Sequence, residues 1–159
     1  MSKAFTKESE SGDDELLISD ETALPPGEKN YTTPKGMEQL RAEFERLRAA
    51  APNSGVRKAA IEHRIAVLLA RLELSEEIDP QKQPADRVLF GASVTVRDEN
   101  DQKKIYRIVG VYETDPKRGL VSWRSPIAKA LMNRRVGDET TLHMPRGEQL
   151  LEIINIEYI

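Results

Sequence analysis

The sequence predicts an α+β protein in which a helical hairpin precedes a small antiparallel sheet that carries one short helix. Apolar residues recur at every third or fourth position within residues 31–78, as they do on one face of a helix. They alternate with polar residues in much of 89–159, as in strands with one face on a core. Because the helical and strand patterns occupy separate halves, the chain is typical of the α+β class.

Composition limits the functions that this chain can have. Its 159 residues suffice for one ordinary domain or two small ones. The chain contains no cysteine and only two histidines, His63 and His143, which argues against disulfides and zinc sites. No apolar run approaches the roughly 18 residues of a membrane span, and the N-terminus lacks a signal-peptide pattern. We therefore expect a cytoplasmic protein with no membrane partner.

Charge is concentrated in an N-terminal tail. Residues 1–30 hold 3 basic and 8 acidic side chains, whereas 31–78 and 79–159 each have one excess basic residue. Few large apolar groups occur in 1–30, so we expect disorder there. The tail is interpreted either as solubilising or as a docking peptide. The rest of the chain lacks the strongly basic surface of proteins whose main partner is bare nucleic acid.

Residues 31–78 are expected to form an antiparallel coiled-coil hairpin. Thr33 and Pro34 suit an N-cap and a first helical position. Two apolar stripes follow, one on each side of the turn residues 52–55. The stripes are Met37, Leu40, Phe44, Leu47 and Ala51, then Ile61, Ile65, Leu68 and Leu72, widened by Val67, Leu69 and Leu74. Arms of about 18–22 residues would be about 27–33 Å long.

A proline-containing linker over 79–88 is expected to lead into the sheet domain, residues 89–159. Strands are predicted around Val94–Val96, over Ile105–Val111 and Leu120–Trp123, and over 139–144 and Leu150–Tyr158. Ser125 as N-cap and Pro126 at the first position begin a short helix between the third and fourth strands.

The residues alone indicate no catalytic site. There is no glycine-rich phosphate loop and no His/Cys cluster with metal-ligand spacing. The acidic runs at 13–15 and 98–101 are interpreted as a solvated tail and a hairpin turn. We therefore expect no catalytic residues, no metal, no cofactor and no enzymatic activity.

Several separated motifs in the second half of the chain carry a family resemblance. They are Ser125-Pro126-Ile127-Ala128-Lys129-Ala130-Leu131, Val136-Gly137-Asp138, Pro145-Arg146-Gly147-Glu148 and Ile156-Glu157-Tyr158. In this order and spacing they resemble the C-terminal domain of the GreA/GreB transcription factors. Asn30-Tyr31-Thr32-Thr33 and Gly36–Leu40 are similar to the start of the coil in GreB-type members.

The resemblance implies a fold and a partner. The fold is an antiparallel coiled coil joined to a domain similar to FK506-binding proteins. The partner is core RNA polymerase, because the family's C-terminal domain grips the rim of the secondary channel while the coil reaches inward. The resemblance places rim docking at Arg124, Ser125, Pro126, Ile127 and Ala128. In the family, acidic side chains at the coil tip help to hold a magnesium ion that supports cleavage of backtracked RNA.

The hairpin tip departs from the family pattern. The tip residues are Pro52, Asn53, Ser54, Gly55, Arg57 and Lys58, and no carboxylate occurs from Ala49 to Val56. The nearest acids, Glu45 and Glu62, are expected about two helical turns down each arm. Basic flanks would repel a cation, and the arms are shorter than the family's usual coil. We therefore expect no stimulation of transcript cleavage.

Arg124 is a second departure, since GreB-type sequences tend to have Asp at this position and GreA-type sequences Asn. With Arg118, Lys129, Arg134 and Arg135 it could form a basic patch. Either the polymerase contact is re-paired or weakened, or Arg124 is only an exposed charge at a strand end.

The leading hypothesis is a monomeric binding module that competes at the channel rim, as for Rnk, a short-coil member of the family. Three alternatives stay open. The first is an active cleavage factor that uses Glu45 or Glu62. The second is a peptidyl-prolyl isomerase, suggested by fold analogy alone. The third is a basic hairpin that binds nucleic acid, a DNA-binding role for which steep salt dependence is the signature.

Overall fold

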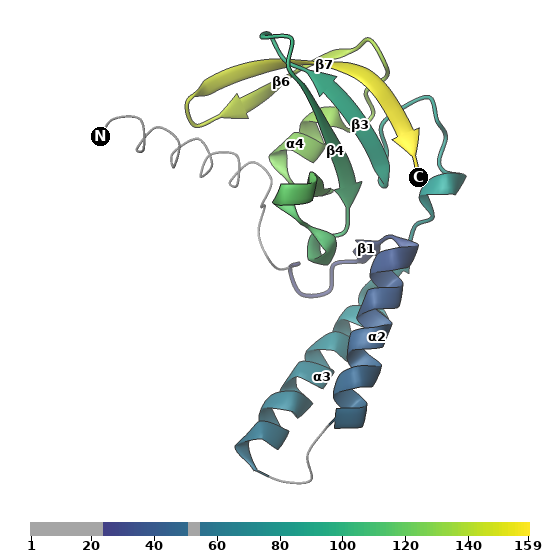
Figure 1. Ribbon diagram of the computed structural model, residues 1–159. Coiled ribbons are helices and arrows are strands. Elements are labelled where there is room, and N and C mark those ends of the chain that lie inside the picture. Colours follow the sequence, from purple (N-terminus) through teal and green to yellow (C-terminus); the bar gives the residue numbers. More distant parts are fainter. Residues whose placement is uncertain (1–23, 51–54) are drawn as a thin grey trace.

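The computed structural model describes residues 24–50 and 55–159, in which a helical hairpin projects from a curled sheet (Figure 1). The hairpin consists of α2 (Pro34–Ala50) and α3 (Val56–Leu74). The strands of the sheet are β3 (Ala92–Arg97), β4 (Lys103–Val109), β5 (Leu120–Ser122), β6 (Glu139–Met144) and β7 (Gly147–Tyr158). The predicted α+β class is confirmed.

The hairpin is capped and packed largely as the sequence indicates. The Thr33 hydroxyl accepts a hydrogen bond from the Gly36 N–H at 3.1 Å, as an N-cap does. With 17 and 19 residues, α2 and α3 are about 26 and 29 Å long. Leu68 is fully buried, but Leu69 and Leu74 are 45% and 41% exposed. The expectation that these two leucines widen the buried stripe was wrong, because both side chains are exposed.

A two-stranded parallel ribbon closes the base of the hairpin. It pairs β1 (Asn30–Thr32) with β2 (Ser75–Glu77), and the Asn30 side-chain amide donates to the Ser75 hydroxyl at 2.9 Å. The sequence does not predict these strands, because three residues are too few to show an alternating pattern. The ribbon ties the entrance of α2 to the exit of α3.

The five-stranded sheet is mixed, with strand order β5-β4-β3-β7-β6. The pairs β3–β4, β3–β7 and β6–β7 are antiparallel, but β5 runs parallel to β4. The expectation of an entirely antiparallel sheet was therefore wrong. The physical reason is the connection after β4, which is a crossover rather than a hairpin turn.

This crossover contains two 3₁₀ turns, Val111–Glu113 and Pro116–Arg118. Val111 therefore lies outside the strand in which the sequence analysis placed it. Gly119 ends the crossover in the left-handed conformation, with φ +70°, and a Cβ there would lie 2.5 Å from the Ile105 carbonyl oxygen. The position needs glycine for both reasons.

The core lies between the sheet and the short helix α4 (Pro126–Leu131), which covers one face of the sheet (Figure 1). Ser125 caps α4, accepting from the Ala128 N–H at 3.3 Å. The buried core side chains are Val88, Phe90, Ala92, Val94, Val96, Ile108, Val121, Ile127, Ala128, Leu131, Leu142, Leu151 and Ile153.

The stretch expected as a linker contributes to this core. Pro80 begins a 3₁₀ turn and is buried, and Val88 is fully buried. The Val88 N–H donates to the Arg134 carbonyl and its own carbonyl accepts from the Asn133 N–H, both at 2.8 Å. The end of this stretch is thus fastened to the chain that follows α4.

Leu131→Ala is expected to lower the free energy of unfolding by about 2–5 kcal/mol, because the removed methyl groups leave a cavity in a closed core. Leu69→Ala, on the exposed side of α3, is the matched control and should change it by less than about 1 kcal/mol. Urea unfolding of the full chain measures both. Equal losses would contradict the placement of α4 against the sheet.

Candidate functional site

The five residues expected to dock on the polymerase rim occupy the turn before α4 and its first helical turn. The Ser125 hydroxyl donates to the Ser122 carbonyl at 2.7 Å, and the Ser122 hydroxyl accepts from the Arg124 N–H at 3.1 Å. Ser125, Ile127 and Ala128 are buried, whereas Pro126 is exposed. Three of the five therefore build the turn, and direct contact with a partner would fall to Arg124 and Pro126.

The Arg124 side chain lies against the segment that precedes the hairpin. Its Nη1 is 3.6 Å from the Glu28 Oε2, and its guanidinium lies 5.9 Å from the centre of the Trp123 ring. The side chain is 19% exposed and that of Glu28 is 48% exposed. Arg124 is therefore a largely covered cation with an intramolecular carboxylate beside it.

The other members of the expected basic patch have separate surroundings. Arg135 lies 3.3 Å from a carboxylate oxygen of Asp86. Arg118 lines a polar cavity of about 250 Å³ together with Lys35 and Arg107. Lys129 and Arg134 are both exposed.

Only part of the expected hairpin tip can be described. Pro52, Asn53 and Ser54 lie outside the described residues, whereas Gly55 and Arg57 are exposed. The neighbouring Val56 side chain is 90% exposed, and Gly55 has φ +95°.

The acids nearest the tip are each paired with a base that lies closer to it. Glu45 is 3.9 Å from Arg48, and Glu62 is 3.7 Å from Lys58. Within residues 24–50 and 55–159, no group of three or more His, Cys, Asp or Glu side chains could hold a metal ion.

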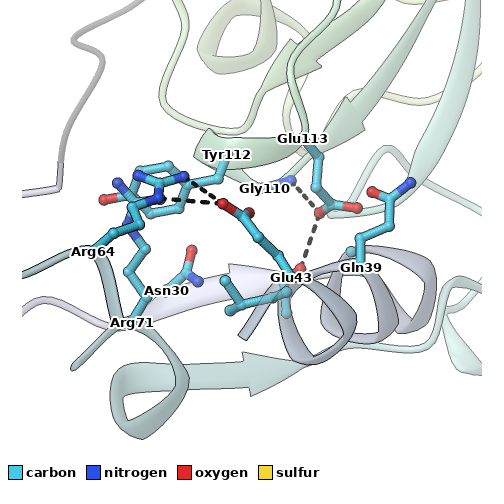
Figure 2. Close-up of a pocket in the computed structure, with 11 residues that line it drawn as sticks. Asn30, Gln39, Glu43, Arg64, Arg71, Gly110, Tyr112 and Glu113 are labelled. Carbon is cyan, nitrogen blue, oxygen red and sulfur yellow. Dashed lines mark hydrogen bonds and ion pairs between the residues drawn. The ribbon is translucent and has the colours of Figure 1, made fainter. Parts of the chain in front are cut away.

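A polar joint connects the hairpin to the sheet domain, and Glu113 is one of the side chains that line its cavity (Figure 2). One carboxylate oxygen accepts from the backbone N–H groups of Thr33 at 3.1 Å and Gly110 at 2.9 Å. It also accepts from the Thr32 hydroxyl at 3.2 Å, and the other oxygen accepts from the Thr33 hydroxyl. A single side chain thus caps the start of α2 and the end of β4 together.

Two further contacts line the same cavity, which has a volume of about 230 Å³. Arg64 of α3 donates to a Glu43 oxygen of α2 at 2.8 Å, and the Arg71 guanidinium lies 3.8 Å from the centre of the Tyr112 ring (Figure 2). A cation over an aromatic face is attractive, so this contact holds α3 against the crossover. Since the charged side chains described here already have partners within the protein, we interpret the cavity as a structural joint rather than a reaction site.

The motifs behind the family resemblance serve the fold. The Tyr158 hydroxyl donates to the Arg87 carbonyl at 2.6 Å and accepts from the Leu89 N–H at 2.9 Å. Burial raises the pKa of Tyr158, so the hydroxyl stays a donor. Asp138 accepts from the Arg135 N–H at 2.8 Å in the turn before β6. These residues close turns and fasten strand ends.

Sequence reasoning missed Glu28 and Glu113. The spacing of Gly110 and Glu113 is that of a capping box, which is a local signal for part of the Glu113 role. Pro25-Pro26-Gly27 is a turn signal that could have placed Glu28 in ordered chain. No local signal indicates that either carboxylate reaches a distant segment.

Comparison with known proteins agrees with the resemblance. Residues 83–158 match the family model described as "Transcription elongation factor, GreA/GreB, C-term". The transcription elongation factor GreB of Neisseria meningitidis is 34% identical over 155 residues, covering 82% of this chain and 95% of that protein. The chain belongs to the GreA/GreB family.

Other relatives of this GreA/GreB-family protein match over different extents. The transcription elongation factor GreA of Novosphingobium aromaticivorans is 38% identical over 103 residues, so the match covers only 65% of each chain. A GreA/GreB structure from Nitrosomonas europaea is 23% identical with a TM-score of 0.43, covering 82% of this chain and all of that one. Among the residues of this chain that the structure describes, no helix is long and apolar enough to span a membrane.

Glu113→Ala is expected to lower the free energy of unfolding by about 2–3 kcal/mol, because it leaves the N–H groups of Thr33 and Gly110 without their acceptor. Amide hydrogen exchange at these two positions should also become faster. Glu99→Ala, in the exposed turn after β3, is the control. Unchanged amide protection in Glu113→Ala would contradict the joint.

Proposed function

We propose that this protein binds RNA polymerase at the secondary-channel rim through its sheet domain and regulates elongation without stimulating transcript cleavage. The observation that carries the proposal is the absence of any carboxylate from Ala49 to Val56, at the end of the hairpin. Magnesium prefers hard oxygen ligands, and cleavage by a second metal ion needs such ligands at the tip.

The placement of the nearest acids supports this proposal. Glu45 lies roughly 8 Å along the axis from the last residue of α2, and Glu62 roughly 9 Å from the first residue of α3, at 1.5 Å per residue. Arg48 and Lys58 lie between these carboxylates and the tip. A cation approaching the tip would meet the basic side chains first.

The length of the hairpin also supports it. The match to the Neisseria GreB runs over 155 residues but includes only 82% of this 159-residue chain, about 130 residues. About 25 positions of the Neisseria GreB in that match therefore have no matching residue in this chain. We propose that these positions belong to the coil of the relative. The hairpin arms here are about 26 and 29 Å long, so the tip would lie closer to the rim than the tip of a longer coil.

An active cleavage factor is the second candidate, favoured by relatives that carry the names GreA and GreB. It would have to use Glu45 or Glu62, because these are the acids nearest to the tip. The two candidates share a partner and a docking surface, and they differ only in what the hairpin does. A monomeric state and contact with nucleic acid remain expectations of the leading candidate.

In a backtracked elongation complex, the purified protein is expected to leave the transcript uncleaved. A bacterial GreB in the same reaction is the positive control and releases the short 3′ RNA product. Denaturing gel electrophoresis of end-labelled RNA measures the rate. Cleavage at a GreB-like rate would contradict the proposal, and its loss in Glu45→Gln or Glu62→Gln would then identify the acid involved.

Binding at the rim predicts competition. Excess protein should suppress cleavage stimulated by GreB, because both would occupy one surface. Arg124→Asp should strengthen this competition, since it restores the residue type that GreB-type sequences tend to carry where they would meet the same surface. Lys103→Asp changes an exposed residue of β4 by the same charge and is the control. Competition unchanged by Arg124→Asp would show that this position does not contact the polymerase.

A further inference from the structure

A polar cavity of about 250 Å³ beside the start of α2 gathers three cations from three separate segments of the chain. Lys35 lies in the first turn of α2, Arg107 lies in β4, and Arg118 ends the second 3₁₀ turn of the crossover. None of the three belongs to the proposed docking turn before α4. The cavity is therefore a basic site that the proposed function does not use.

The backbone that carries the two arginines is ordered by hydrogen bonds of the crossover. The Arg107 N–H donates to the Gly119 carbonyl at 2.9 Å, and the Arg118 N–H donates to the Asp115 carbonyl at 3.0 Å. Gly119 follows Arg118 directly and has the left-handed conformation. Because both segments are held in place in advance, a ligand in the cavity would not have to order the chain in order to bind.

The cations of this cavity have few acceptors of their own. Among the described residues, neither Lys35 nor Arg118 forms an ion pair. The Arg107 Nη2 donates to the Ile159 carbonyl at 3.2 Å, but its Nε–H is buried and meets no acceptor in the described part of the chain. A buried donor without an acceptor is destabilising, so an anion in the cavity would supply what these groups lack.

Two carboxylates line the same cavity, and neither neutralises these cations by direct contact. Glu113 accepts from the Thr32 and Thr33 hydroxyls and from the N–H groups of Thr33 and Gly110. Asp115 is partly buried and forms no ion pair with any residue that the structure describes. Three cations against two carboxylates leave the cavity with an excess positive charge. The cavity therefore attracts anions.

The start of α2 adds to this positive potential. The N–H groups at the N-terminus of a helix carry partial positive charge, so an acidic residue is favourable in the first turn and a cation is not. The first turn of α2 contains Lys35 and no acidic residue. The Lys35 charge thus opposes the helix dipole, and an anion bound beside it would offset both.

We infer that this cavity binds the phosphate group of a small ligand. A guanidinium donates paired hydrogen bonds that match phosphate oxygens, and a lysine ammonium adds a point charge. A phosphate monoester carries a charge of about −1.5 to −2 at neutral pH, so three cations attract it more strongly than they attract a carboxylate. A free phosphate compound fits better than a nucleic acid, because the chain lacks the strongly basic surface that follows a nucleic-acid backbone.

Titration of the full-length protein with inorganic phosphate, at constant ionic strength maintained with chloride, tests this inference. Backbone amide resonances around the cavity should shift and saturate, with a dissociation constant on the order of 1–10 mM. Arg118→Gln and Lys35→Gln should each weaken binding about 3- to 10-fold. Lys117→Gln removes the same charge from an exposed neighbour that does not line the cavity, and it should leave the affinity unchanged.

A variant with the opposite effect separates charge from structure. Asp115→Asn keeps the shape of the side chain but removes its negative charge, so it should tighten phosphate binding about 2- to 5-fold. The Asp115 side chain forms no capping hydrogen bond in its 3₁₀ turn, so the fold should not change. Glu99→Gln, in the exposed turn after β3, makes the same change in net charge and should not alter binding. Unchanged affinity in both Asp115→Asn and Arg118→Gln overturns the inference.

Separate titrations with a nucleoside triphosphate and with a short single-stranded oligonucleotide identify the source of the phosphate. Saturable shifts at the cavity with inorganic phosphate or the nucleotide, weakened in Arg118→Gln, support the inference. Binding of the oligonucleotide alone overturns the small-ligand site and assigns the cavity to nucleic acid. No saturable shift with any of the three probes overturns the site itself. Because none of these measurements contains RNA polymerase, each outcome leaves the proposed function to be decided by its own experiments.

Discussion

The Glu113 carboxylate determines how the hairpin leaves the sheet domain. One oxygen accepts N–H groups from Thr33, at the start of α2, and from Gly110, at the end of β4. The fit is close, because a Cβ at Gly36 would lie 2.3 Å from the Glu113 carboxyl carbon and one at Gly110 would lie 2.5 Å from the Tyr31 carbonyl oxygen. Two glycines thus allow one side chain to join two domains. The direction of the hairpin, and so the position of its tip relative to any partner of the sheet domain, depends on this joint.

Most of the motif residues that carry the family resemblance stabilise the fold. Ser125 caps a helix, Asp138 closes a turn, and Tyr158 fastens the last strand to residues 87–89. Changing any of them would remove a buried or turn-closing hydrogen bond. Arg57 at the hairpin tip and Pro126 of the proposed docking turn are exposed, and a change of side chain at such positions costs the fold little. A chain can therefore belong to the family while its tip and docking surface differ.

Local signals predicted much of the architecture. The N-caps at Thr33 and Ser125, the turn at 98–101 and the α+β class depend on neighbouring residues, and the structure confirms them. The ribbon of β1 and β2, the parallel placement of β5 and the burial of Val88 depend on residues far apart in the chain. Periodicity over a few residues carries no information about such pairings.

For the candidate site, too, some features follow from the sequence and others from the tertiary structure. The sequence by itself determined that the hairpin end carries no carboxylate and has basic flanks, because these are statements about which residues are present. Only the tertiary structure decided that Ser125, Ile127 and Ala128 are buried while Pro126 is exposed, and that Arg124 faces Glu28. The physical reason is that burial and ion pairing arise where segments about 100 residues apart meet, and that meeting is set by packing of the whole chain.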